Sequence, residues 1–201
     1  MRLQGTLAGE CPPLSAPPGG GGGGMARLWG SAFGDLGYSS DSNWSAGEHF
    51  RVWWNKSILD TDAWTAPSTH FQIELMGPTA DSTVISGVCL GEGDGGHNYQ
   101  NGNTAPVTFN GGDTALVLNP GDLVISDDIP LVVDPGFFQS LVVGVEFSGT
   151  SKVIRNSDHH DGSVFCVTYD SDGEKGPCEN LTGIPTLTAY TALVTRIWVF
   201  F

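Results

Sequence analysis

The sequence predicts an all-β protein, a single β-sandwich or jelly-roll domain carried behind an N-terminal arm. Three observations predict this fold class. The 201-residue chain contains 29 glycines and 12 prolines but only 15% charged residues, a balance typical of short strands joined by tight turns. Several segments alternate apolar and polar residues with the period of two that half-buried strands show. Turn sequences such as NPGD at 119–122 separate these segments.

The arm comprises residues 1–26. CPPLSAPP at 11–18 is followed there by six glycines at 19–24. Proline favours extended backbone and polyglycine has high backbone entropy, so this segment is not expected to fold alone. We expect the arm to be disordered or to be ordered by a neighbouring subunit. Met25 directly follows the glycine run and is an alternative start of the protein.

The folded domain is expected over residues 27–201, with about ten short strands. The segments predicted to be strands are 48–54, 69–76, 83–90, 105–110, 113–118, 122–125, 129–133, 140–148, 151–155, 163–168 and 186–200. In the second of these, Phe71, Ile73 and Leu75 fall on one face, which predicts the core side. The last is apolar on both faces and suits burial between two layers or against a neighbouring subunit. Residues 35–47, rich in Ser, Gly and Asp, are expected to form a surface loop.

The charge is strongly acidic, with 8 Lys and Arg against 22 Asp and Glu and a formal net charge of -14. The stretch 57–151 contains no Lys or Arg at all. Such a field repels nucleic-acid phosphates and anionic lipid surfaces, so neither is an expected partner. No segment approaches the ~20 apolar residues that span a bilayer, so no membrane insertion is expected and the protein is predicted to be soluble or secreted.

The four cysteines are Cys11, Cys89, Cys166 and Cys178, and none belongs to a CxxC pair. This spacing disfavours zinc-ribbon and thioredoxin-like sites. Cys166 and Cys178 flank a polar turn and can bridge it in an oxidising compartment, but the sequence does not reveal the compartment.

Known catalytic patterns are each incomplete in this sequence. Glu92-x-Asp94-x-x-His97 is similar to the E-x-D-x-x-E motif of laminarinase-like glycoside hydrolases, but a histidine stands where the second glutamate is needed. Gly34-Asp35-Leu36 has leucine where a GDS(L) motif has its serine, and no G-x-S-x-G elbow exists. We therefore predict a protein that is not an enzyme and that has no cofactor.

Two polar turns are candidates for metal ions. The sequence DHHD at 158–161 places two histidines next to each other, and adjacent side chains of an extended segment point to opposite sides, so a solvated turn is expected. Asp170, Asp172 and Glu174 place oxygen ligands at alternate positions, as some calcium loops do. The twelfth-position glutamate of an EF-hand loop is missing, so a plain turn is expected, with Ca²⁺ as the alternative.

Aromatic residues are the candidates for contact surfaces, because their rings stack on sugars and anchor protein interfaces. The candidates for stacking on a surface glycan are the loop residues Trp44, Trp64 and Tyr99. The candidates for contact with a partner subunit are Trp29, Trp198, Phe200 and Phe201. Trp53 and Trp54 are adjacent on a predicted strand, so only one of them is expected to face inward.

A span of about a fifth of the chain, residues 107–147, resembles a known module. The segments VTFNGGD at 107–113, LVLNPGDLVISDDIPLVV at 116–133 and LVVGVEF at 141–147 resemble the β-sandwich module N-terminal to the catalytic domain of some SGNH/GDSL-type esterases. The positions that match its pattern are Phe109, Gly111, Gly112, Gly121, Ser126, Asp127, Leu131 and Val133. The resemblance implies a β-sandwich, but the catalytic part of such enzymes is absent from this sequence.

The layout of an arm followed by an acidic sandwich is similar to that of virion decoration, cement and fibre-base proteins of tailed phages, whose arms lace onto a capsid or a neighbouring chain. We therefore expect a non-enzymatic structural or binding protein in a larger assembly such as a phage virion. Its partners would be copies of itself or capsid and tail proteins. The alternatives are a carbohydrate-binding module that uses loop tryptophans and an accessory module of a secreted esterase.

Overall fold

The computed structural model describes residues 23–30, 38–44, 46–156, 164–169, 176–180, 186–188 and 191–201. These residues form fourteen strands and one short 3-10 helix, η1 (Lys56–Ile58), with no α-helix among them. The strands build two large antiparallel sheets and a small third one. The predicted all-β sandwich is therefore confirmed, while residues 1–22 of the predicted arm lie outside the described residues.

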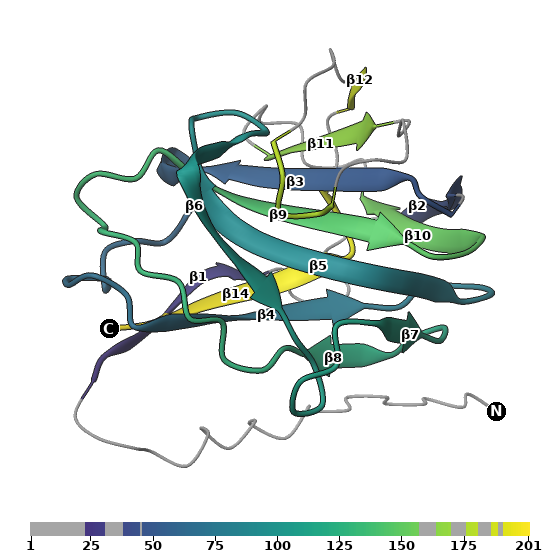
Figure 1. Ribbon diagram of the computed structural model, residues 1–201, viewed down its shortest axis with the longest axis horizontal. Helices are drawn as coiled ribbons and strands as arrows, with labels where there is room; N and C mark the ends of the chain where they lie inside the picture. The colour runs from purple at the N-terminus through teal and green to yellow at the C-terminus, as the bar shows by residue number, and fades with distance from the viewer. Residues whose placement is uncertain are drawn as a thin grey trace, which may run out of the picture.

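The first sheet, sheet A, has the strand order β1-β14-β4-β8 (Figure 1). Its strands are β1 (Met25–Gly30), β14 (Val194–Phe200), β4 (His70–Met76) and β8 (Leu123–Ile125). The two ends of the described chain thus meet, because β1 pairs with β14 along its length. Strand β1 begins at Met25, two residues before the predicted start of the domain.

The second sheet, sheet C, has the order β12-β11-β3-β9-β5-β6, with β7 pairing the first part of β5. Its strands are β12 (Thr186–Thr188), β11 (Val164–Tyr169), β3 (His49–Asn55), β9 (Ser140–Phe147), β5 (Thr83–Gly93), β6 (Tyr99–Val107) and β7 (Leu116–Leu118). Strand β9 is paired on both sides, by β3 and β5. Its valine-rich sequence suits a strand that is buried along almost its whole length.

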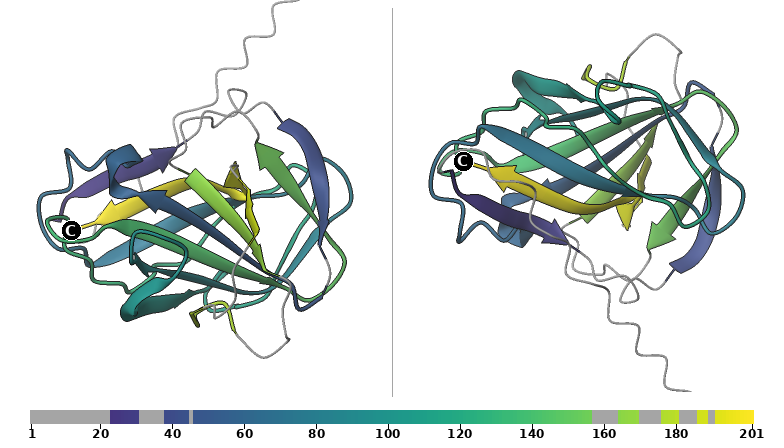
Figure 2. Two further views of the ribbon diagram at one scale, coloured as in Figure 1. Left: turned by 90° about the horizontal axis from the view of Figure 1, so that it is seen from above. Right: turned by 90° about the horizontal axis from the view of Figure 1, so that it is seen from below.

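A third sheet, sheet B, has the order β13-β10-β2. It contains β13 (Thr191–Ala192), β10 (Ser151–Asn156) and β2 (Tyr38–Trp44). Strand β10 is anchored to the start of β5, where the Val84 backbone N–H donates to Ser151 Oγ at 2.9 Å. Strands β2 and β10 lie on the side of the molecule opposite the carboxyl terminus (Figure 2).

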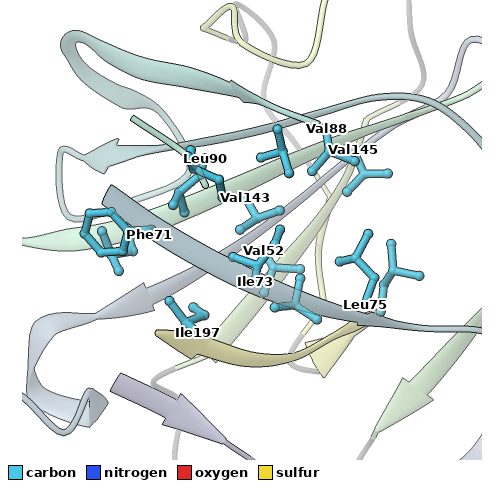
Figure 3. Close-up of a cluster of buried hydrophobic side chains, with 14 of the residues drawn as sticks. Val52, Phe71, Ile73, Leu75, Val88, Leu90, Val143, Val145 and Ile197 are labelled. Carbon is cyan, nitrogen blue, oxygen red and sulfur yellow. The ribbon is translucent and has the colours of Figure 1, made fainter. Parts of the chain in front are cut away.

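The main core lies between sheets A and C (Figure 3). Phe71, Ile73 and Leu75 of β4 are fully buried, as their alternation predicts. They face inward-pointing side chains of sheet C, which include Val52, Val88, Leu90, Val143 and Val145. The layers therefore meet through the two apolar faces that a sandwich requires.

Several predicted boundaries are wrong. Residues 38–44, predicted to lie in a loop, form β2 because their backbone pairs with β10 and not because of any apolar alternation. Strand β6 begins at Tyr99, six residues before the predicted strand 105–110. Residues 129–133 form no strand, yet Ile129, Leu131 and Val133 are buried and Ile129 pairs with Phe71. The predicted strand 186–200 is divided into β12, β13 and β14, with Leu193 at a φ of 67° just before β14.

The disulfide connects Cys89 and Cys178, whose Cα atoms are 5.2 Å apart. The suggested bridge between Cys166 and Cys178 is therefore wrong. It rested on closeness in the sequence, whereas Cys178 lies against the outer face of sheet C, where β5 presents Cys89. Trp54 points into the main core and Trp53 points to the outer face of sheet C, so only one of the two faces inward, as expected. Both are nevertheless buried, because Trp53 packs in the cluster that contains Cys89.

Candidate binding surface

The outer face of sheet A carries a set of aromatic, apolar and basic side chains. Residues directly opposite each other on antiparallel strands project to the same face, so the strand register defines its rows. We call this set the aromatic face; its members are Met25, Arg27, His70, Gln72, Leu123, Ile125, Arg196, Trp198 and Phe200.

The first row of the aromatic face runs from Met25 through Phe200 to His70. The rings of Phe200 and His70 are stacked, with centroids 4.2 Å apart and planes inclined by 10°. Met25 is 50% exposed, so this row ends in a free thioether at the sheet edge. The row offers a flat, mostly apolar strip.

The second row runs from Arg27 through Trp198 to Gln72. Gln72 Nε2 donates to Asp128 Oδ1 at 3.0 Å, which fixes the polar end of the row. Trp198 is half-buried, and Arg27 is exposed and has no carboxylate within 4 Å among the described residues. The guanidinium of Arg27 is therefore a free cation beside an accessible indole.

The third row contains Arg196 and Glu74, joined by an ion pair of 2.7 Å between Nη1 and Oε2. The other carboxylate oxygen of Glu74 accepts a hydrogen bond of 2.6 Å from Thr195 Oγ1. Thr195 lies where the register between β14 and β4 shifts, which brings its hydroxyl onto Glu74. Glu74 is buried with both oxygens satisfied, so this row is neutral overall.

A cleft of about 640 Å³ opens beside the polar end of the second row. It is lined by Gln72, Thr108, Gly111, Gly112, Ser126, Asp127 and Asp128. The carboxylate of Asp127 accepts the backbone N–H groups of Gly111 and Gly112, at 3.0 and 2.9 Å, and the Thr108 hydroxyl at 2.8 Å. The hydrogen bond from Gly111 is the main reason that the pKa of Asp127 lies below its usual value.

The same contacts explain part of the resemblance to the esterase-associated module. Gly111 and Gly112 have φ values of 85° and 129°, which favour glycine, and Asp127 caps the turn that they form. The matched residues Gly111, Gly112 and Asp127 thus serve a local turn in this chain.

The four predicted partner contacts divide into two groups. Trp198 and Phe200 lie on the aromatic face, whereas Trp29 and Phe201 pack against the main core. The register of β1 shifts between Arg27 and Trp29, and the Trp29 ring lies 6.1 Å from that of Trp54. Sequence alternation placed His70 and Gln72 opposite the core side, but their alignment with Trp198 and Phe200 depends on a strand pairing that no local signal reveals.

Two of the three predicted glycan contacts, Trp64 and Tyr99, are not at an accessible surface. Trp64 and Tyr99 are each 3% exposed. Trp64 packs between Phe71 and Phe138, with ring centroids 5.7 and 5.0 Å away. The assignment of these two rings as stacking platforms is therefore wrong, because both faces are covered. Trp44 lies in β2, and its side chain is outside the described part of the structure.

The predicted metal candidates also lie outside the described residues, both the 158–161 cluster and the calcium candidates Asp170, Asp172 and Glu174. Within the described ranges, no group of three or more His, Cys, Asp or Glu side chains is placed to hold a metal ion. In the same ranges, no helix has the length and apolar character needed to cross a bilayer.

The chain was compared with protein-family models and with curated protein sequences. No protein-family model matches the chain, and no curated protein sequence matches it.

Proposed function

We propose that this protein is a non-enzymatic structural subunit that associates with further copies of itself through the aromatic face, within a larger assembly such as a phage virion. The observation that carries the proposal is the half-buried Trp198 next to the uncompensated Arg27 on a molecule of net charge -14. The chain layout, with a glycine-rich arm ahead of an acidic sandwich, supports membership of a particle.

The composition of the aromatic face supports a protein contact. Interfaces are enriched in Trp, Phe, Met and Arg and depleted in Lys, Glu and Asp. Six large apolar side chains are exposed among the described residues, and three of them, Met25, Leu123 and Ile125, lie on sheet A. Apolar side chains gathered on one face and edged by polar groups are typical of an interaction site.

Charge complementarity favours a second copy as the occupant. The stretch 57–151 has no Lys or Arg and carries most of the described carboxylates, so a neighbouring copy can present acidic groups to Arg27. A contact between unlike patches is heterologous and produces rings or filaments when it repeats. Such repetition is what a particle subunit requires.

Three described carboxylates, one of which lines the cleft, are engaged in structural hydrogen bonds, which supports a binding role. Asp122 Oδ2 accepts the backbone N–H of Asn119 at 2.7 Å, and Asp134 Oδ1 accepts that of Gly136 at 2.7 Å. Asp127 is occupied in the same way. Proton transfer to a substrate requires a carboxylate free to approach it, and these three are committed to turns.

Light scattering coupled to size-exclusion chromatography tests the proposal. The full chain is expected to self-associate at micromolar concentration when the salt is high enough to screen the repulsion between copies of net charge -14. Truncation of an interface tryptophan costs about 2 kcal/mol, so Trp198→Ala is expected to weaken association about thirtyfold. Phe137→Ala is the matched control, because Phe137 is 81% exposed and lies outside the aromatic face. A chain that stays monomeric at every concentration, or a Trp198→Ala variant that associates like the control, would refute the proposal.

Membership of a particle is tested separately by deleting residues 1–24 and measuring incorporation of the variant into assembled particles. Incorporation is expected to fall. Unchanged incorporation counts against a role for the arm and leaves the association through the aromatic face to be judged by the first test.

A further inference from the structure

The outer face of sheet C is closed, in contrast to that of sheet A, and it contains an unusual buried cation. Arg51 of β3 is fully buried. The register aligns it with Gly144 of β9 and Cys89 of β5. Because Gly144 has no side chain, the guanidinium can lie close to it; a Cβ there would be 3.1 Å from Arg51 Nε.

The partners of Arg51 do not neutralise its charge. Its Nη2 donates to the backbone oxygen of Glu179, and its guanidinium carbon lies 4.3 Å from the centre of the Tyr99 ring. No carboxylate lies within 4 Å of it among the described residues. Nε and Nη1 are buried and make no hydrogen bond of normal geometry there. Burial lowers the pKa of Arg51, and the neighbouring Tyr99 side chain offsets this only in part. A buried cation with unsatisfied donors is costly unless an anion compensates it.

His49 extends the same cluster. It is almost fully buried, and its Nδ1 also has no hydrogen-bond partner among the described residues. Burial is the main cause that lowers the pKa of His49, so the ring is neutral near pH 7, with Glu146 acting in the opposite direction. The cluster therefore combines one permanent cation with a neutral group that is able to donate or accept a hydrogen bond.

The segment 176–180 covers this cluster. The backbone oxygen of Pro177 accepts the Tyr99 hydroxyl at 2.8 Å, directly over Gly144. Asn180 Oδ1 accepts the Tyr99 backbone N–H at 2.7 Å. Apart from the main chain, which joins the segment to β11 and β12, the Cys89–Cys178 disulfide attaches it covalently to sheet C. We call residues 176–180 the cover.

We propose that Arg51 and His49 form a cryptic binding site for a small tetrahedral oxyanion, phosphate or sulfate, which becomes accessible when the Cys89–Cys178 disulfide is reduced and the cover is released. A planar guanidinium with two unused nitrogens matches the oxygens of such an anion. The Glu179 carbonyl that now occupies Nη2 leaves with the cover, so a third donor is freed on opening.

The opening step is a reduction by a dithiol. The dithiol supplies two electrons and two protons, the Sγ–Sγ bond breaks, Cys89 and Cys178 become thiols, and the dithiol closes into its own disulfide. Anion binding then follows without any further covalent change.

Thermal unfolding in inorganic phosphate, with chloride at equal ionic strength as the reference, tests the proposal on the full chain. Cys89→Ala/Cys178→Ala is the permanently opened form. Phosphate at about ten times its Kd is expected to raise the Tm of this form by about 4 °C, and the same result is expected for dithiol-reduced wild type. The oxidised wild type is expected to bind at least tenfold more weakly.

Two arginine variants in the opened background complete the test. Arg51→Met is expected to abolish the response to phosphate, whereas Arg27→Met, which removes an exposed guanidinium from sheet A, is expected to retain it. If Arg51→Met fails to fold, Arg51→Lys replaces it in the test. Lysine keeps the charge but lacks the paired N–H donors of the guanidinium, so this variant is expected to bind phosphate about tenfold more weakly than the opened form with Arg51, as measured by calorimetry. Three results would overturn the proposal. The Arg51→Met variant could still respond to phosphate, both opened forms could fail to respond, or the oxidised wild type could respond as strongly as the opened forms.

Discussion

Removal of the Cys89–Cys178 disulfide is expected to be among the most destabilising changes available in this chain. The bridge spans a sequence separation of 89 residues. In the chain-entropy model a closed loop of this length restricts the unfolded state by about 4.6 kcal/mol. For a protein of this size that free energy corresponds to a fall in Tm of about 10–15 °C.

The same experiment distinguishes this pairing from a bridge between Cys166 and Cys178. The closed loop would then be only 12 residues, for which the model gives about 2.8 kcal/mol. Trypsin separates the three cysteines, because Cys89, Cys166 and Cys178 fall on peptides 57–152, 156–175 and 176–196. Mass spectrometry of a non-reduced digest is expected to find the first peptide joined to the third.

Calorimetry of Cys89→Ala/Cys178→Ala against wild type measures the shift, with Cys166→Ala as the control that leaves the linked peptides unchanged. A digest that joins 156–175 to 176–196 would refute the pairing. A double variant that unfolds within a degree or two of wild type would refute the loop-entropy reasoning. Loss of the disulfide would then cost less than the ~2–4 kcal/mol that is typical of such bridges.

Three further substitutions test the packing described here. Glu74→Ala leaves the part-buried Arg196 unpaired and is expected to lower the free energy of unfolding by about 3 kcal/mol in urea titrations; an effect below about 0.5 kcal/mol would contradict the importance of this ion pair. Gly144→Ala places a methyl group against the cover and is expected to cost about 1–3 kcal/mol, whereas Gly96→Ala, in a roomier turn, serves as its control. Burial lowers the pKa of His49 in the folded state, so the unfolded chain binds more protons than the folded one as the pH falls below about 6.5, and stability is lost there. His49→Gln is expected to make the Tm less dependent on pH in this range. An unchanged pH profile of the Tm in this variant would argue against a contribution from His49.

The parts of the fold that alternation controls were predictable from the sequence. Phe71, Ile73 and Leu75 are buried as expected because their spacing matches the pleat of β4. Strand β9 was predicted almost to the residue because its valine-rich run suits only a buried strand. The local sequence of these elements is sufficient to predict them.

Elements that depend on pairing were not predictable in the same way. Strand β2 has a polar sequence and exists through its ladder with β10. The beginning of β6 at Tyr99 lies among glycines, yet its ring fills the space that Gly91 leaves open on β5. Sequence patterns indicate which face of a segment is buried. They carry no information about which distant strand lies beside that segment.

The candidate surfaces show the same division. Trp198 and Phe200 were identified as contact residues because a strand that is apolar on both faces needs something on its second face. Arg27, His70 and Gln72 were missed, since they join that surface only through the register of three strands. Trp64 and Tyr99 were misassigned because polar neighbours in the sequence do not imply an exposed ring.

The two proposed surfaces lie on opposite sides of the sandwich, and this separation has a functional consequence. Packed sheets are about 10 Å apart, so the aromatic face of sheet A and Arg51 on the far side of sheet C share no side-chain contact. Free energies of sites so separated generally add. Occupation of the aromatic face therefore brings no partner into contact with the cover of the same subunit. Reduction of the disulfide is expected to open the Arg51 site without breaking the contacts that a subunit makes through its own aromatic face.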